Sequence, residues 1–282
     1  MPSNSVGPAA SRPAYSPAQA PKASGPLWRW LPARCEVCGR WPSAPAGQAV
    51  CATCLADCLP PRLRCPRCAL AHAEPPSTPG TGQPLTQEPP PCLACQNNSP
   101  PLARCIAALD YGYPWHTLIQ RFKFNGEVAW AGLLAQLLWQ TPHVPTTMAA
   151  CDWWLPLPLS ARRLGERGYN QSWELLKHLA ALHPKTPTPA RHQADWLLKI
   201  GDTADQHALG RAERLRNLGS VFSVAPHALP HLAGRDVLLV DDVMTTGATL
   251  HAAGLALRRA GVRSVSALVL ARTPPPEPLS PQ

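Results

Sequence analysis

The sequence predicts an α/β protein in which a parallel sheet, covered by helices on both faces, follows a small cysteine-rich metal-binding region. Short apolar runs of strand length alternate with longer amphipathic stretches from Leu102 onward, as is typical of parallel strands joined by crossover helices. Ahead of them, eight cysteines form C-x-x-C pairs within residues 35–95. A chain of 282 residues is long enough to bury a core without disulfides.

Proline marks the boundaries of these units, because helix and sheet interiors reject it. Of the 36 prolines, 7 lie ahead of Arg34, 9 between residues 75 and 101, and 5 in the last nine residues. We therefore expect disordered tails at 1–34 and 274–282. Between them we expect a metal-binding region at 35–98, with a proline-rich loop at 73–91, and an α/β domain at 102–273.

The charge and hydropathy of the chain limit where it acts and what it binds. A net charge of +9 suits ligands that carry phosphate, or nucleic acid, without choosing between them. The most apolar stretch, Val128 to Trp139, is shorter than a membrane span and is broken by Gln136. The amino-terminal residues lack the apolar core of a secretory signal. We expect a cytoplasmic protein without a membrane span.

The cysteine pairs predict zinc rather than disulfides in a reducing compartment. Two residues between thiolates allow one tight turn to present both sulfurs to one ion, and two such turns complete a tetrahedral site. The predicted ligands are Cys35, Cys38, Cys51, Cys54, Cys65, Cys68, Cys92 and Cys95. Eight ligands make about two structural zinc sites. Sequential pairing is the simplest arrangement, and interleaved pairing stays open.

The other cysteines fit no such pair. Cys58, Cys105 and Cys151 are interpreted as buried thiols, and His72 is a possible substitute ligand. The region from Arg34 to Asn98 has few large apolar residues, so metal binding would supply its folding energy.

Periodicity predicts the elements of the second unit in order. A helical pattern between residues 115 and 139 contains Gly126, where we expect an interruption. The predicted strands are Ile106–Tyr111, Asp152–Leu157, Val237–Val240 and Val265–Leu270, and the predicted helices are Trp115–Trp139, Ser172–Leu182 and Ala248–Ala260.

The most specific motif follows the strand Val237–Val240. Asp241 and Asp242 come at its carboxyl end, where open α/β sheets place ligands. Thr245, Thr246, Gly247, Ala248 and Thr249 then offer hydroxyls and amides at the start of a helix, a favourable place for phosphate. The motif predicts an acid pair for ribose hydroxyls beside a cradle for a 5-phosphate.

This motif resembles the binding site for phosphoribosyl pyrophosphate of the type I phosphoribosyltransferases. That resemblance implies a phosphoribosyltransferase-like sheet and Mg²⁺ bound with the ligand. A Walker-type nucleotidase fits less well, because the chain contains no Gly-Lys dipeptide. Purine-salvage members carry an acid where this chain has Thr245, so the pattern looks more like the orotate-type enzymes and leaves the general base unassigned.

Over residues 35–273 the chain is similar to the ComF family. The matching residues after the cysteine pairs are Phe122-Lys123-Phe124 with Gly126, Pro156-Leu157-Pro158-Leu159, Arg162-Arg163-Leu164, Arg167-Gly168-Tyr169-Asn170-Gln171, Gln206, Leu209, Arg211, Arg214, Asn217 and Phe222. The resemblance implies a double zinc ribbon fused to a phosphoribosyltransferase domain, in proteins linked to bacterial competence and DNA uptake. It supplies no acceptor substrate.

Transfer from phosphoribosyl pyrophosphate requires cations on the departing pyrophosphate. The candidates are Arg162 and Arg163, which follow a strand end, and Arg211 and Arg214 in the segment that matches a mobile loop. With Asp241 and Asp242 they are the candidate catalytic residues.

Two functions of different class fit these residues. The first is an enzyme that binds phosphoribosyl pyrophosphate with Mg²⁺ and transfers the phosphoribosyl group. The second is a non-catalytic competence protein that uses the same fold to hold single-stranded DNA or DNA-uptake partners.

Overall fold

The computed structural model describes residues 34–41, 50–59, 62–72, 89–124, 126–183, 191–200 and 221–275. Most of both predicted tails, most of the loop at 73–91, and the candidates Arg211 and Arg214 lie outside these residues.

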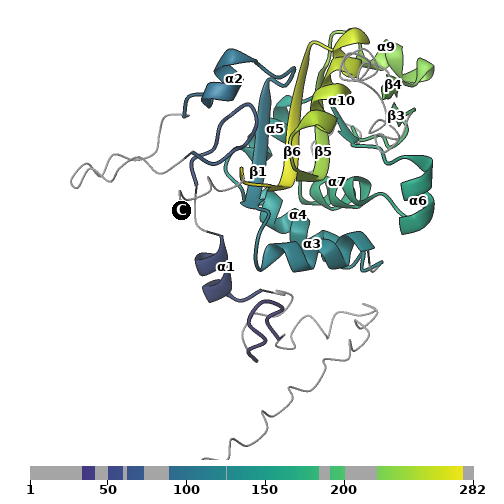
Figure 1. Cartoon of the computed structure of the whole chain (residues 1–282). Coiled ribbons are helices and arrows are strands. Elements are labelled where there is room, and N and C mark those ends of the chain that lie inside the picture. The colour runs from purple at the N-terminus through teal and green to yellow at the C-terminus, as the bar shows by residue number, and fades with distance from the viewer. Residues whose placement is uncertain are drawn as a thin grey trace, which may run out of the picture.

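Four parallel strands form the central sheet in the order β1-β6-β5-β2 (Figure 1). They are β1 (Arg104–Asp110), β2 (Trp153–Pro156), β5 (Asp236–Met244) and β6 (Ser264–Arg272). The residues Val237–Val240 are fully buried, as expected for a strand covered on both faces. β5 pairs with β6 as far as Met244, whereas β2 stops at Pro156 opposite Val240. The end of β5 therefore extends past β2.

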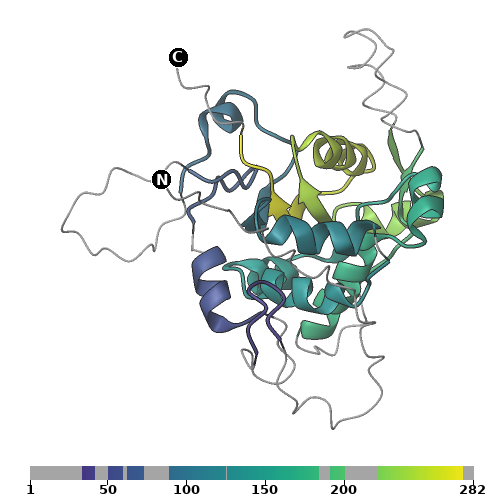
Figure 2. The same cartoon turned by 60° about the horizontal axis from the view of Figure 1, so that its bottom comes forward.

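Helices cover both faces of this sheet, as Figure 2 shows in a view close to the strand direction. One face carries α3 (Trp115–Phe124), α4 (Trp130–Trp139), α5 (Val144–Ala150) and α7 (Gln171–Leu182). The other carries α10 (Ala248–Arg259). Smaller elements complete the unit: α6 (Ala161–Arg167), β3 (Leu197–Lys199), β4 (Phe222–Val224), η4 (Pro226–Ala228) and α9 (Leu229–Leu232). β3 and β4 form a separate antiparallel pair. The predicted α/β architecture is confirmed.

Two separate cores follow from this layering. Leu118, Leu134 and Leu175 pack against Leu238 and Leu268 on the face of α3, α4 and α7. On the opposite face, residues of α10 pack against alternate residues of the same strands. The interruption expected near Gly126 is present, because α3 ends at Phe124, α4 begins at Trp130, and Gly126 has φ +66°.

The cysteine-rich region contributes to both cores rather than forming its own. Its helices are α1 (Ala52–Cys58) and α2 (Leu93–Asn97). Cys35, Cys51 and Cys54 belong to the core on the α3 face, and Ala69 belongs to the core on the α10 face. The two halves of this region thus join opposite faces of the sheet. Within the described ranges, no helix has both the length and the apolarity needed to cross a bilayer.

Candidate functional site

The candidate site lies at the carboxyl edge of the sheet, where β2 and β5 end as neighbours. From β2 the chain continues to α7 on one face, and from β5 it continues directly to α10 on the other. Open α/β sheets bind ligands where two such connections diverge. The structure brings Asp241, Asp242 and residues 245–249 to this edge, as the sequence predicts.

The two acids lie in the part of β5 that extends past β2, yet their surroundings differ. Asp241 Oδ1 accepts hydrogen bonds from Ser172 Oγ at 3.0 Å and from the Asp242 amide at 2.9 Å. Asp242 is 6% exposed, and its Oδ1 lies 3.1 Å from Lys123 Nζ. Burial and then repulsion by Asp242 raise the pKa of Asp241 to about 7. A cation bound here would stabilise the charged form of Asp241.

Lys123 is positioned by the segment Arg167–Gln171, which runs from the last residue of α6 to the first residue of α7. The Tyr169 hydroxyl donates to the Phe122 carbonyl, and Gln171 Nε2 donates to the Lys123 carbonyl at 3.3 Å. The Arg167 guanidinium lies over the Phe124 ring, 5.0 Å from its centre. Each residue of Phe122-Lys123-Phe124 is thus contacted by this segment. Two motifs that are far apart in the sequence form one support for the acid pair.

The same segment fixes the loop after β2. Asn170 Nδ2 donates to the Leu157 carbonyl at 3.1 Å, while its Oδ1 caps α7 by accepting from the Ser172 and Trp173 amides. Ser160 caps α6 in the same way, accepting from the Arg163 amide at 3.4 Å. Hydrogen bonds from these two side chains therefore fix the backbone of the loop after β2 at the edge of the sheet.

The candidates Arg162 and Arg163 lie on the first turn of α6. Arg162 is exposed and forms an ion pair with Glu166 at 3.1 Å. Within the part of the chain that the structure describes, no ion pair joins either arginine to Asp241 or Asp242. Both arginines lie on the helix that follows β2, at the sheet edge where β5 carries the acids.

Residues 245–249 turn from β5 into α10 and present polar groups to solvent. Thr245, Thr246 and Thr249 are exposed, and the Ala248 amide donates to Thr246 Oγ1 at 3.3 Å. Gly247 is the N-cap and has φ +84°, a conformation that side chains disfavour. A Cβ at Gly247 would lie 2.4 Å from Met244 Cε. The hydroxyls and backbone amides at the start of this helix suit a phosphate.

Arg272, at the end of β6, is a neighbour of this loop that sequence reasoning missed. It is 8% exposed, and its guanidinium donates to the carbonyls of Met244, Thr245 and Cys68. In the sequence, Arg272 is distinguished only as the charged residue that ends an apolar run.

The paired cysteines form two groups of four, in sequential order. Cys35, Cys38, Cys51 and Cys54 make the first, and Cys65, Cys68, Cys92 and Cys95 make the second, with the sulfurs of each group within 4.8 Å of one another. Each group offers four thiol ligands for one metal ion. His72 belongs to neither group.

Backbone hydrogen bonds favour the thiolate of one cysteine in each group, Cys35 and Cys65, whereas burial raises the pKa of Cys54, Cys68 and Cys95. Burial raises the pKa of Cys35, but backbone N–H groups, led by that of Cys38, outweigh it and lower the pKa to about 6. In the second group the Cys92 amide donates to Cys65 Sγ at 3.3 Å. Backbone donors of this kind stabilise thiolates, which are the form that binds metal.

The unpaired cysteines are mostly the buried thiols that the sequence predicts. Cys105 and Cys151 are buried, and burial raises the pKa of each to about 12. Cys58 is half-buried at the end of α1, where its carbonyl accepts from Trp115 Nε1 at 2.7 Å.

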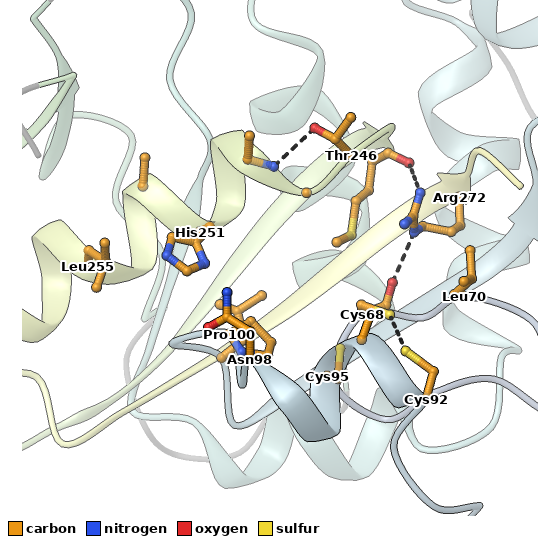
Figure 3. Close-up of a pocket in the computed structure, with 16 residues that line it drawn as sticks. Cys68, Leu70, Cys92, Cys95, Asn98, Pro100, Thr246, His251, Leu255 and Arg272 are labelled. Atoms are coloured by element: carbon orange, nitrogen blue, oxygen red, sulfur yellow. Dashed lines mark hydrogen bonds between the residues drawn. The ribbon is translucent and has the colours of Figure 1, made fainter. Parts of the chain in front are cut away.

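A cavity of about 440 Å³ separates the second cysteine group from the start of α10 (Figure 3). Cys68, Cys92 and Cys95 line one side, and Thr246, Gly247 and His251 line the other. Arg272 forms part of its wall. The cysteine region and the loop at 245–249 are therefore neighbours in space.

Comparison with known proteins agrees with this geometry. Residues 202–279 match the phosphoribosyl transferase domain family. The chain is 31% identical to the DNA utilization protein YhgH of Escherichia coli O6:H1, over 86% of this chain and 98% of that protein. It is also 31% identical to competence protein F of Haemophilus influenzae, over 64% of this chain and 78% of that protein.

A shorter match, 32% identical over 42% of this chain and 44% of its relative, is to competence protein ComFC of Bacillus subtilis. The parallel sheet, the phosphoribosyl transferase match and the two cysteine groups occur here in one chain. With relatives that cover most of its length, these features show that the chain belongs to the ComF family.

Proposed function

We propose that this chain binds phosphoribosyl pyrophosphate, or a related ribose 5-phosphate, with Mg²⁺ and transfers the phosphoribosyl group to an acceptor. One observation carries the proposal: the same strand and helix join an exposed phosphate-type loop to an acid pair in which Asp242 is buried and Asp241 is half-buried. Residues 245–249 would hold the 5-phosphate, and Asp241 and Asp242 the ribose hydroxyls or the Mg²⁺ shell. Arg162 and Arg163 would face the pyrophosphate, with Arg211 and Arg214 from outside the described residues.

The acid pair fits a hard divalent cation. Mg²⁺ prefers carboxylate oxygens together with substrate phosphates. Lys123 neutralises Asp242, which leaves Asp241 as the group whose charge a bound cation would stabilise. The cation would supply charge stabilisation for the departing pyrophosphate.

The two cysteine groups are proposed as structural zinc sites. Four sulfurs in each group fill a tetrahedral shell and leave no position for a substrate. Thiolate sites of this kind persist in a reducing compartment, so we assign the protein to the cytoplasm. The names of the relatives support a role in competence or DNA utilization.

The proposal is tested by calorimetric titration with phosphoribosyl pyrophosphate and Mg²⁺. Replacing both acids would leave the half-buried Lys123 without its partner, a change that lowers stability. The single change Asp241→Asn is therefore preferable, and it should weaken binding at least about tenfold, because charged hydrogen bonds contribute roughly 1.5 to 3 kcal/mol each.

Asp236→Asn is the matched control, because Asp236 lies at the opposite end of β5 and pairs with Arg263. It should leave the affinity unchanged. Release of pyrophosphate in a screen of nucleobase and nucleotide acceptors would establish catalysis. If the parent protein binds no phosphoribosyl ligand but binds single-stranded DNA with steep salt dependence, the fold serves as a non-catalytic scaffold instead.

A further inference from the structure

We infer that Arg272 is a positioning residue that couples metal binding at the second cysteine group to the shape of the loop at 245–249. The guanidinium stands between the two features (Figure 3). Nε donates to the Cys68 carbonyl at 3.0 Å, and Nη1 donates to the carbonyls of Met244, at 3.2 Å, and Thr245. One planar side chain thus joins a predicted metal ligand to the start of the phosphate-type loop.

The charge of Arg272 supports the coupling. The side chain is buried, and among the described residues its hydrogen-bond acceptors are backbone carbonyls, with no carboxylate in an ion pair with it. A buried cation without a counter-ion is unfavourable. Four thiolates around Zn²⁺ carry net negative charge. Because Cys68 is one of these ligands and its carbonyl accepts from Arg272, a second site with zinc bound would place negative charge near the buried guanidinium.

Among the described residues, Arg272 supplies two of the hydrogen bonds that hold the first part of the loop. Thr245 and Thr246 are exposed, and the turn ends at Gly247, which has no side chain to pack. Arg272, at the end of β6, donates to the carbonyls of Met244 and Thr245. The Met244 carbonyl also accepts from the Thr273 amide at 3.0 Å. Loss of the guanidinium would free the Thr245 carbonyl and leave the Met244 carbonyl with the Thr273 amide alone, which would shift the amides that follow.

Arg64, an arginine of the cysteine-rich region, provides a matched control. Arg64 Nη1 donates to the Ala69 carbonyl at 3.3 Å and to Asp110 Oδ1 at 2.7 Å. It therefore docks the cysteine region on the end of β1 without touching the loop. A general loosening of this region would follow from Arg64→Gln as well as from Arg272→Gln, whereas the coupling depends on Arg272 alone.

Hydrogen exchange of the amides in residues 244–250 measures the coupling directly and without a phosphosugar. Removing the second site by Cys92→Ser with Cys95→Ser should speed this exchange about fivefold or more. Arg272→Gln should have a similar effect, and adding it to the cysteine variant should bring little further change. Arg64→Gln should leave the loop unchanged. Arg272→Lys should restore the charge but not the exchange rate, because one ammonium cannot bridge both sides.

If the cysteine variant fails to fold, removal of zinc from the parent protein by a chelator replaces it. By linkage, Arg272→Gln should also speed zinc release to that chelator. The coupling would be overturned if loss of the second site left the exchange rate of the loop amides unchanged. It would also be overturned if the effects of losing the site and of Arg272→Gln were additive.

The effect of this coupling on ligand binding rests on the proposed binding of phosphoribosyl pyrophosphate. The coupling and the proposed function can each be refuted without the other. A parent protein that binds no such ligand but shows coupled exchange refutes the function alone. A parent that binds the ligand but shows no coupling refutes the inference alone.

Discussion

At the scale of single residues, two adjacent acids have different surroundings because different distant side chains contact them. Asp242 is paired with Lys123 from α3, and Asp241 accepts a hydrogen bond from Ser172 at the start of α7. Sequence reasoning located both acids and the loop after them, because their spacing is local. It could not assign Lys123 or Ser172 to them, because those contacts exist only once α3 and α7 pack on the sheet.

The raised pKa of Asp241 predicts how ligand binding depends on pH. Because Mg²⁺ and its ligand require the charged carboxylate, affinity for phosphoribosyl pyrophosphate should fall as the pH drops from about 8 to about 6, by up to about tenfold per pH unit. Asp241→Asn should remove the part of this dependence that belongs to the protein, leaving only the titration of the ligand phosphates. Equal pH profiles for parent and variant would contradict the assignment.

The same shift gives stability the opposite pH dependence. Folding raises the pKa of Asp241 from 3.8 to about 7, so the folded state holds this proton more tightly. The contribution of Asp241 to stability should therefore decline as the pH rises from about 4 to about 7. Urea midpoints of the parent protein and Asp241→Asn measure it.

At the scale of elements, the long apolar segments and the short strand β2 were predictable, and most of the other short elements were not. The strands β1, β5 and β6 and the helices α7 and α10 follow clear periodicity. α1, α2, α6 and the pair β3 and β4 are too short for a pattern to indicate them. β5 is longer than the run Val237–Val240 because pairing with β6 continues to Met244. That pairing carries the acids within the strand, where polar residues alone would suggest a loop.

The turn from β5 into α10 yields a prediction at Gly247. Gly247→Ala should cost about 1 to 2 kcal/mol of stability, because the backbone there is left-handed, and its Cβ would displace the Met244 side chain. The shifted amides should also weaken phosphate binding. Gly165→Ala is the control, since a Cβ there meets open space within α6. It should be neutral or stabilising by up to about 1 kcal/mol. Thermal unfolding and titration with ribose 5-phosphate test both changes.

At the scale of the whole molecule, the cysteine-rich region completes the α/β unit from both sides of the sheet. The first group joins the core on the α3 face, where Trp115 donates to the Cys58 carbonyl. The second group lies beside α10 and reaches the loop through Arg272. The sequence predicts the ligand spacing but not this division, because nothing in the spacing indicates which face each group contacts.

This division predicts unequal effects when either group is removed. The parent protein should contain about two zinc ions per chain, and either Cys35→Ser with Cys38→Ser or Cys92→Ser with Cys95→Ser should leave about one. Each change removes folding energy from its own half of the region. The first change should leave ligand affinity nearly unchanged, because Gln171 holds the Lys123 carbonyl and Tyr169 holds the neighbouring Phe122 carbonyl.

The second change should lower ligand affinity, because the loop at 245–249 loses a support on the β6 side. Zinc content by mass spectrometry and titration with phosphoribosyl pyrophosphate measure the two effects on the same samples. Parent protein with less than about one zinc ion, after expression with zinc present, would refute the metal assignment. An equal loss of affinity in the two variants would mean that the whole region, rather than its second half, supports the site.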